Sequence, residues 1–370
     1  MRVAPFVAFR STIHRLLIAC LTSLAVAWPL LSNAQSASSK VRPAESAGRF
    51  AQHDQAMAFA RELDARAGWE DQWAQRWIQA AERNNQVIRL MRPAPTGTPR
   101  NWMVYRDRFV EPRRLQAGLS FWQTHDAVLR RAESEFGVPA WLIVGIIGVE
   151  TLYGQHTGSF RVLDALTTLA FHFPPEHPRA EQRAAFFLSE LEAFLRKSRD
   201  AATPPTQWRG SYAGAIGLPQ FMPSNWGLYG VDYDGDGRVD LLNSPADAIG
   251  SVARYMQAFG WQTGMPTHFT LRFEPDRLQL DALRAPSILP TFTPAVMESL
   301  GVVLDEAGRQ HPGPLALVEL ENGDPSQGGR PRTYVAGSTN FYAITRYNQS
   351  SYYALAVIEL GRAVESLWRR

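Results

Sequence analysis

One carboxylic acid lies in an unusually apolar stretch of the chain. Glu150 ends the run Val138-Pro139-Ala-Trp-Leu-Ile-Val-Gly-Ile-Ile-Gly-Val-Glu150, in which every other side chain is apolar. Pro139 suits the first turn of a helix, and a helix that is apolar on every side must be buried. Burial of an unpaired carboxylate is costly, so we expect the pKa of Glu150 to rise. Three isoleucines share its face of the predicted helix: Ile143, Ile146 and Ile147.

This acid has two interpretations. A carboxylic acid that stays protonated near neutral pH can donate a proton to a leaving oxygen, as the cleavage of a glycosidic bond requires. The alternative is a structural glutamate paired with an arginine, because structural ion pairs also shift pKa values. Spacing alone favours neither interpretation. The apolar helix is too short to cross a bilayer.

A second group of carboxylates occurs in the loop Asp232-Tyr-Asp-Gly-Asp-Gly-Arg-Val-Asp240. Its acids at positions 1, 3, 5 and 9 and its glycine at position 6 match the opening of an EF-hand calcium loop, in which oxygen ligands surround the ion. At position 12, Asn243 replaces the bidentate glutamate of that pattern. We predict a structural calcium site; the alternative is a solvated Asp/Gly turn. The predicted ligands are Asp232, Asp234, Asp236 and the backbone carbonyl of Arg238.

The elements that must position these groups are mainly helical. Apolar residues recur at helical spacing through most of the chain, whereas residues 268–335 contain short strand-forming runs separated by Pro and Gly. The predicted class is therefore mainly α (α+β), with a small β-containing insertion. The predicted segments are a signal peptide at 1–34, a linker at 35–48, a helical N-terminal subdomain at 49–135, a core at 136–265 containing the loop 232–247, a small α+β subdomain at 266–338, and a return to the core at 339–370.

The first residues have the pattern of a signal peptide. Basic residues precede an apolar stretch from Leu16 to Leu31, and the small residues Ser32-Asn33-Ala34 follow. We expect export with cleavage after Ala34; the alternative is a retained N-terminal anchor. Cys20, the only cysteine, lies inside this stretch and is interpreted as filler rather than a lipidation site, so the mature chain is expected to have no thiol chemistry. Removal of the three N-terminal arginines leaves 35 basic against 35 acidic residues. This balance lacks the excess of basic residues that is typical of nucleic-acid-binding proteins.

Five motifs occur in order along the chain. They are Gly145-Ile-Ile-Gly-Val-Glu-Thr-Leu-Tyr-Gly154, Arg161-Val-Leu-Asp-Ala-Leu-Thr-Thr-Leu169, Gly210-Ser-Tyr-Ala-Gly-Ala-Ile-Gly-Leu-Pro-Gln-Phe-Met-Pro-Ser224, Asp247-Ala-Ile-Gly-Ser-Val-Ala253 and Asn340-Phe-Tyr-Ala-Ile-Thr-Arg-Tyr-Asn348. In this order they resemble the motifs of the membrane-bound B type of lytic murein transglycosylases (glycoside hydrolase family 103). The resemblance covers most of the chain from about Phe50 to the C-terminus, and the order of the motifs is far more specific than any one of them.

The resemblance implies a lysozyme-like helical core and a reaction. The β-1,4 bond between N-acetylmuramic acid and N-acetylglucosamine in peptidoglycan would be cleaved, and the muramic 6-hydroxyl rather than water would close on the anomeric carbon to give a 1,6-anhydro product. Glu150 would protonate the leaving oxygen and later take the hydroxyl proton. The usual two-carboxylate scheme needs a second acid, and the matched motifs contain no obvious one; the substrate's own N-acetyl group would stabilise the cation.

The resemblance also implies roles for further residues. Ser211 would orient the glutamate or the N-acetyl group, although serines also cap turns. The implied groove residues are Gln220, Asn348, Tyr105, Tyr255, Tyr347 and Tyr353. For each tyrosine, core packing with a satisfied hydroxyl is the alternative. Asp247 would close the calcium loop, although Ser244-Pro-Ala-Asp247 also fits a helix cap and both roles can hold.

Two other functions stay open at this point: a hydrolytic muramidase on the same fold, and a non-catalytic peptidoglycan-binding scaffold. No catalytic cofactor is expected, since His172 and His177 lack a convincing ligand set. The expected partners are peptidoglycan glycan strands, with cell-wall synthesis or division proteins as candidate protein partners and no nucleic acid. We expect a monomer in the periplasm, with outer-membrane association as an option.

Overall fold

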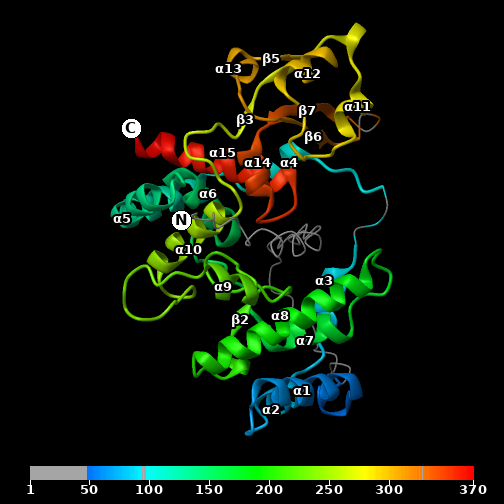
Figure 1. Cartoon of the computed structure of the whole chain (residues 1–370), viewed down its shortest axis with the longest axis vertical. Coiled ribbons are helices and arrows are strands. Elements are labelled where there is room, and N and C mark those ends of the chain that lie inside the picture. Colours follow the sequence, from blue (N-terminus) through cyan, green and yellow to red (C-terminus); the bar gives the residue numbers. More distant parts are fainter. Residues whose placement is uncertain (1–47, 94, 96, 325, 327) are drawn as a thin grey trace, which may run out of the picture.

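A computed structural model describes residues 48–93, 95, 97–324, 326 and 328–370. The predicted signal peptide, including Cys20, and positions 35–47 of the predicted linker lie outside the described residues. Within the described part, helices dominate and a small β-containing region occupies one end of the molecule (Figure 1). The mainly helical class with a β-containing insertion is thereby confirmed.

Two of the three N-terminal helices begin at a residue whose side chain accepts a backbone hydrogen bond. His53 Nδ1 accepts from Ala56 N (3.2 Å), and Asn84 caps the third helix in the same way. Such caps satisfy amides that have no partner inside the helix. Asp64 accepts from Ala74 N (2.7 Å) and thereby joins the first two helices. These helices are α1 (Asp54–Ala67), α2 (Trp73–Gln79) and α3 (Asn85–Met91).

The apolar helix lies at the centre of the main core. It is α6 (Ala140–Thr151), and its neighbours are α5 (Pro112–Phe136) and α15 (Ser351–Trp368). Glycines let the α6 and α15 backbones approach closely: a Cβ on Gly145 would lie 2.4 Å from Val357 O, and one on Gly361 would lie 2.1 Å from Trp141 O. The short helix α4 (Trp102–Asp107) packs on α15. The core therefore requires glycine at these contacts, whatever its cost in helix propensity.

Four more helices and one short ladder complete the helical part. α7 (Val162–Phe171) packs along α8 (Ala180–Asp200), and α9 (Pro223–Tyr229) packs against α8. α10 (Pro245–Ala258) contacts α5 and α6. Strands β1 (Phe160–Arg161) and β2 (Arg209–Gly210) pair antiparallel and hold the start of the 211–222 loop against the segment that follows α6.

The β-containing region has its own small core. Three antiparallel strands lie in the order β3-β7-β6, with a separate β4-β5 pair. Phe269, Leu283, Met297 and Leu317 belong to this core, whereas Val318 and Leu320 of β6 pack into the main core. The elements are β3 (His268–Phe269), β4 (Leu271–Phe273), α11 (Leu280–Arg284), α12 (Pro294–Ser299), β5 (Val302–Leu304), α13 (Glu306–Arg309), β6 (Ala316–Asn322), β7 (Arg330–Gly337) and α14 (Thr339–Thr345).

The main hydrophobic core includes residues from Phe50 to Val364, and the last helix, α15, packs on α6, α5 and α4. The domain boundaries given from the sequence stay predictions. No single described helix is long and apolar enough to cross a membrane. Helices α5 and α6 satisfy those criteria only as a pair, and the chain bends by 115° between them.

Candidate active site

Glu150 is the only residue of α6 that is not buried. It lies in the last turn of the helix and is partly exposed, while its carboxyl group contacts the buried side chain of Tyr353. Burial raises the pKa of the Glu150 carboxyl to about 7, and a hydrogen bond from Tyr353 acts in the opposite direction. Glu150 therefore keeps its proton to a higher pH than an ordinary glutamate does, which suits a general acid.

Tyr353 on α15 contacts this carboxyl directly. Its hydroxyl donates to Glu150 Oε1 over 2.7 Å, while Oε2 accepts no hydrogen bond within the described part of the chain. No ion pair among the described residues includes Glu150, so the sequence-based alternative of a glutamate paired with an arginine has no support in the geometry. The arrangement fixes one oxygen and leaves the other to hold a transferable proton.

The four tyrosines that the sequence resemblance assigned to the groove lie near the acid. Burial raises the pKa of each phenol, and the Glu150 charge raises each further. Tyr347 and Tyr353 stack with ring centroids 6.1 Å apart, and Tyr255 lies 4.8 Å from Tyr347. Tyr105 approaches from α4, where it packs against Phe109.

The hydroxyls of these tyrosines differ in their partners. Tyr255 donates to Arg346 O (2.8 Å) and Tyr347 donates to Pro219 O (2.6 Å), so both rings are fixed inside the protein. The hydroxyl of Tyr105 makes no hydrogen bond within the described residues. Tyr105 is thus the one of these four tyrosines whose hydroxyl donates to no described residue, whereas Tyr255 and Tyr347 also fit a packing role.

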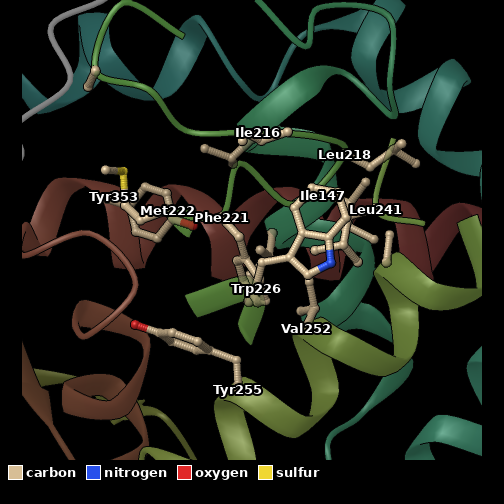
Figure 2. Packing of buried hydrophobic residues seen from close by; sticks show 14 of the residues in the cluster. Ile147, Ile216, Leu218, Phe221, Met222, Trp226, Leu241, Val252, Tyr255 and Tyr353 are labelled. Carbon is tan, nitrogen blue, oxygen red and sulfur yellow. The ribbon is translucent and has the colours of Figure 1, made fainter. Parts of the chain in front are cut away.

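The 211–222 loop is joined to the end of α6. Thr151 Oγ1 donates to Leu218 O over 2.9 Å, directly beside Glu150. Figure 2 shows Ile216, Leu218 and Phe221 of this loop among the buried core residues. The Phe221 ring lies 5.5 Å from the Tyr255 ring. Sequence reasoning did not select Thr151; its signal is a hydroxyl on an apolar helix one residue from the acid.

Ser211 and Gln220 both bond to backbone in the structure. Ser211 Oγ accepts from Ala215 N (3.0 Å), which is the turn-capping role considered above. Gln220 has a left-handed backbone (φ 49°), and its amide nitrogen donates to Thr157 O and Gly217 O. These bonds shape the loop beside Glu150, and no contact of either side chain with Glu150 is recorded among the described residues.

Asn348 offers an unsatisfied acceptor. Its Oδ1 is buried and has no hydrogen-bond partner within the described residues. Because a buried acceptor without a partner is costly, such an atom points to a ligand or a water that completes it. Of the predicted polar groove residues, Asn348 carries the clearest sign of binding.

The acidic loop gathers three of its predicted ligands. Carboxylate oxygens of Asp232, Asp234 and Asp247 lie within 4.8 Å of one another. Asp247 also accepts from Tyr233 N (2.7 Å) and Asp240 N (2.7 Å), so it organises the loop as well as belonging to the cluster.

The predicted ligand Asp236 and the proposed cap Ser244 have contacts of their own. Asp236 lies outside the cluster, and its Oδ2 faces Arg238 Nε (3.1 Å). Ser244 Oγ accepts from Asp247 N, as the cap interpretation predicted. Asp247 therefore holds both positions that the sequence suggested, in the cluster and in the first turn of α10.

Comparisons with known proteins agree on one family. Residues 51–362 match the transglycosylase SLT domain family. The chain is 37% identical over 338 residues to the membrane-bound lytic murein transglycosylase B of Escherichia coli, covering 86% of this chain and 84% of that protein.

Solved structures give the same result. The Escherichia coli lytic transglycosylase Slt35 in complex with calcium is 36% identical with a TM-score of 0.73, covering 90% of this chain and all of the other. SltB3 of Pseudomonas aeruginosa, in complex with NAG-NAM-pentapeptide, is 29% identical with a TM-score of 0.68, covering 85% and 79%. These structures confirm the lysozyme-like helical fold that the sequence resemblance implied.

Proposed function

Because the chain belongs to the lytic murein transglycosylase family, we propose that Glu150 is the single general acid and base of its reaction. The observation that carries this proposal is the position of the Glu150 carboxyl: it is held at Oε1 by Tyr353 (2.7 Å), and its pKa is raised to about 7 by burial. A peptidoglycan glycan strand is the proposed substrate, in keeping with the NAG-NAM-pentapeptide bound to the SltB3 structure.

In the proposed reaction, Glu150 donates one proton and later takes one back. Protonated Glu150 donates to the oxygen that joins N-acetylmuramic acid to N-acetylglucosamine, and the bond from that oxygen to the muramic anomeric carbon breaks. The N-acetyl group of the same sugar stabilises the positive charge. The muramic 6-hydroxyl then attacks the anomeric carbon and returns its proton to Glu150. The products are a free 4-hydroxyl and a 1,6-anhydro ring, and no water is consumed.

A single carboxylate is consistent with the surroundings of Glu150. Burial and Tyr353 account for the shift of its pKa, and no second carboxylate of the described residues contributes to that shift. Two-carboxylate glycosidases place their acids about 5 to 9.5 Å apart. The groups around Glu150 are tyrosines, whose faces suit the C–H surfaces of sugars.

The substrate-binding role is assigned to the polar and aromatic residues around the acid. Asn348 supplies a buried, unpartnered Oδ1, and Tyr105 supplies an unbonded hydroxyl beside the carboxyl. Ser211 and Gln220 shape the loop that faces them. Tyr255, Tyr347 and Tyr353 pack against one another beside the acid, and Tyr353 holds its orientation through the hydrogen bond to Oε1.

A calcium ion is proposed for the loop 232–247. The convergence of the Asp232, Asp234 and Asp247 carboxylates supports it, since calcium prefers oxygen ligands. When bound, the ion would neutralise this acidic cluster and fix the loop ahead of α10; it takes no part in the glycan chemistry. The same kind of ion is present in the Slt35 structure.

Export to the periplasm is proposed from the N-terminal sequence pattern. The membrane-bound Escherichia coli relative supports a place at a membrane surface, and association with the outer membrane follows as part of the proposal.

The products test this function. Purified protein is incubated with sacculi, and the released muropeptides are separated and weighed by mass spectrometry. We expect 1,6-anhydro ends, which are lighter by one water than the reducing ends made by hydrolysis. A product mixture dominated by reducing ends would contradict the proposed function and support a muramidase.

A further inference from the structure

The chain reverses direction directly after Glu150 through a strained turn. Leu152 (φ 51°) and Tyr153 (φ 57°) both adopt left-handed backbone, which non-glycine residues keep only where surrounding contacts hold them. Leu152 N donates to Gly148 O (3.1 Å), which closes the last turn of α6. The turn that carries the acid therefore depends on whatever holds these two residues and the Gly148 carbonyl.

The Tyr153 ring is held between α5 and α6. A Cβ on Gly118 of α5 would lie 2.4 Å from the Tyr153 hydroxyl oxygen, and one on Gly148 of α6 would lie 2.5 Å from it. The Phe121 ring lies 5.3 Å from the Tyr153 ring. Glycine weakens a helix interior, so two glycines facing one phenol mark a site shaped for that side chain.

Arg114 reaches the same place from α5. It is only 8% exposed, and its Nη1 donates to Gly148 O. Its guanidinium also lies over the Phe109 ring, 5.1 Å from the centroid. No described ion pair includes Arg114. A cation beside the last carbonyls of a helix is favourable, and this cation touches the carbonyl two residues before Glu150.

Two polar atoms in this cluster have no partner among the described residues. They are Arg114 Nε and the Tyr153 hydroxyl, both buried. The positive charge of Arg114 also lowers the pKa of Tyr153 against the larger effect of burial, so the two groups are neighbours. A buried guanidinium and an unsatisfied phenol are costly in a core, and such features are retained at functional sites.

We propose that Arg114 and Tyr153 are positioning residues that fix the Glu150 carboxyl through the last turn of α6. Arg114 holds the Gly148 carbonyl and Tyr153 fills the space between α5 and α6, so the carboxyl stays in reach of both Tyr353 and the glycosidic oxygen. The inference rests on the proposed role of Glu150. Displacement of a catalytic group by about 1 Å can cost on the order of 100-fold in rate.

The test is a double-variant cycle on the full mature chain. For Arg114→Met we expect kcat on sacculi to fall roughly 10- to 100-fold, with KM within about twofold. In the Glu150→Gln background the same substitution is expected to cause no further loss, because Arg114 acts only through that carboxyl. Glu150→Gln alone tests the proposed function, so failure of that proposal is seen separately.

The neighbouring Arg113 provides a matched control. It is exposed and donates to Gln155, so Arg113→Met removes the same charge and is expected to leave kcat unchanged. Arg114→Lys keeps a cation near Gly148 O and is expected to recover part of the rate. If Arg114→Met does not fold, Gly118→Ala, which displaces the Tyr153 ring, is used in the same cycle. Wild-type kcat in Arg114→Met or Gly118→Ala, or an equal further loss in the Glu150→Gln background, would overturn the inference.

Discussion

Two acidic regions of this protein use the same functional group in opposite ways. Glu150 lies at the end of an apolar helix, bonded to one phenol, and burial raises its pKa to about 7. The Asp232–Asp247 loop collects several carboxylates near solvent, where backbone amides donate to them; Asp232, for example, accepts from Gly235 N and Gly237 N. Dry surroundings disfavour the charged form of a carboxyl group, whereas carboxylate oxygens that lie close together suit a cation such as calcium. The first region can therefore supply a proton, and the second can hold a cation.

Replacement of the acid should give the largest effect. Glu150→Gln keeps the shape of the side chain but removes the transferable proton, so we expect turnover of sacculi to fall by at least ~100-fold while the fold is kept. Glu190 offers a matched control, because it is another buried glutamate but bonds Ser224 N and Oγ away from this site. Glu190→Gln should keep its kcat. Normal cleavage by Glu150→Gln would remove the acid from the mechanism.

Loss of the phenol that holds the acid should have the next largest effect. Tyr353→Phe removes the hydrogen bond to Glu150 Oε1. A hydrogen bond to a charged group contributes about 1.5–3 kcal/mol, so we expect kcat to fall roughly 10- to 100-fold. That bond lowers the pKa of Glu150, so its loss should raise this pKa and move the basic limb of the pH–rate profile to higher pH. A basic limb that moves to lower pH would contradict the geometry.

The polar residues of the proposed substrate-binding site should affect the product as well as the rate. An attached hydroxyl held in line has a large effective concentration, so positioning decides whether it or water reaches the anomeric carbon. We expect Asn348→Ala and Ser211→Ala to lower activity less than Glu150→Gln does and to raise the share of reducing ends. The ratio of anhydro to reducing muropeptides measures this partition. An unchanged ratio in both variants would show that neither residue controls it.

The acidic loop should affect stability and leave the chemistry intact. Calcium that binds only the folded state raises Tm as its concentration rises. Asp234→Ala removes a member of the carboxylate cluster and should abolish this shift, while Asp276→Ala, at an exposed aspartate elsewhere, should keep it. Equal Tm values in chelator and in millimolar calcium would rule the site out.

The sequence predicted the features that depend on local pattern. The apolar run from Ala140 to Val149 could only be a buried helix, and Glu150 was its only acid. The EF-hand spacing identified Asp232 and Asp234, which do converge. These predictions succeeded because helix burial and loop geometry are set by residues close together in the chain.

The features that depend on packing between distant segments were beyond sequence reasoning. The hydrogen bond from Tyr353 to Glu150 joins residues 203 positions apart, and only the family resemblance placed Tyr353 near the acid. Sequence reasoning did not select Arg114, because nothing in its spacing indicates the contact with Gly148 O. Asp236 fits the loop pattern as well as its neighbours do, yet it bonds Arg238 instead.

The pH dependence of kcat/KM on soluble glycan strands tests the central claim most directly, because it reports the ionisation of the free enzyme's acid. Since Glu150 must be protonated to act and burial raises its pKa to about 7, activity should be highest below neutrality and should fall about tenfold per pH unit above that pKa. A basic limb near the ordinary pKa of a glutamate, about 4.3, or a rate that stays constant well into the alkaline range, would contradict the account.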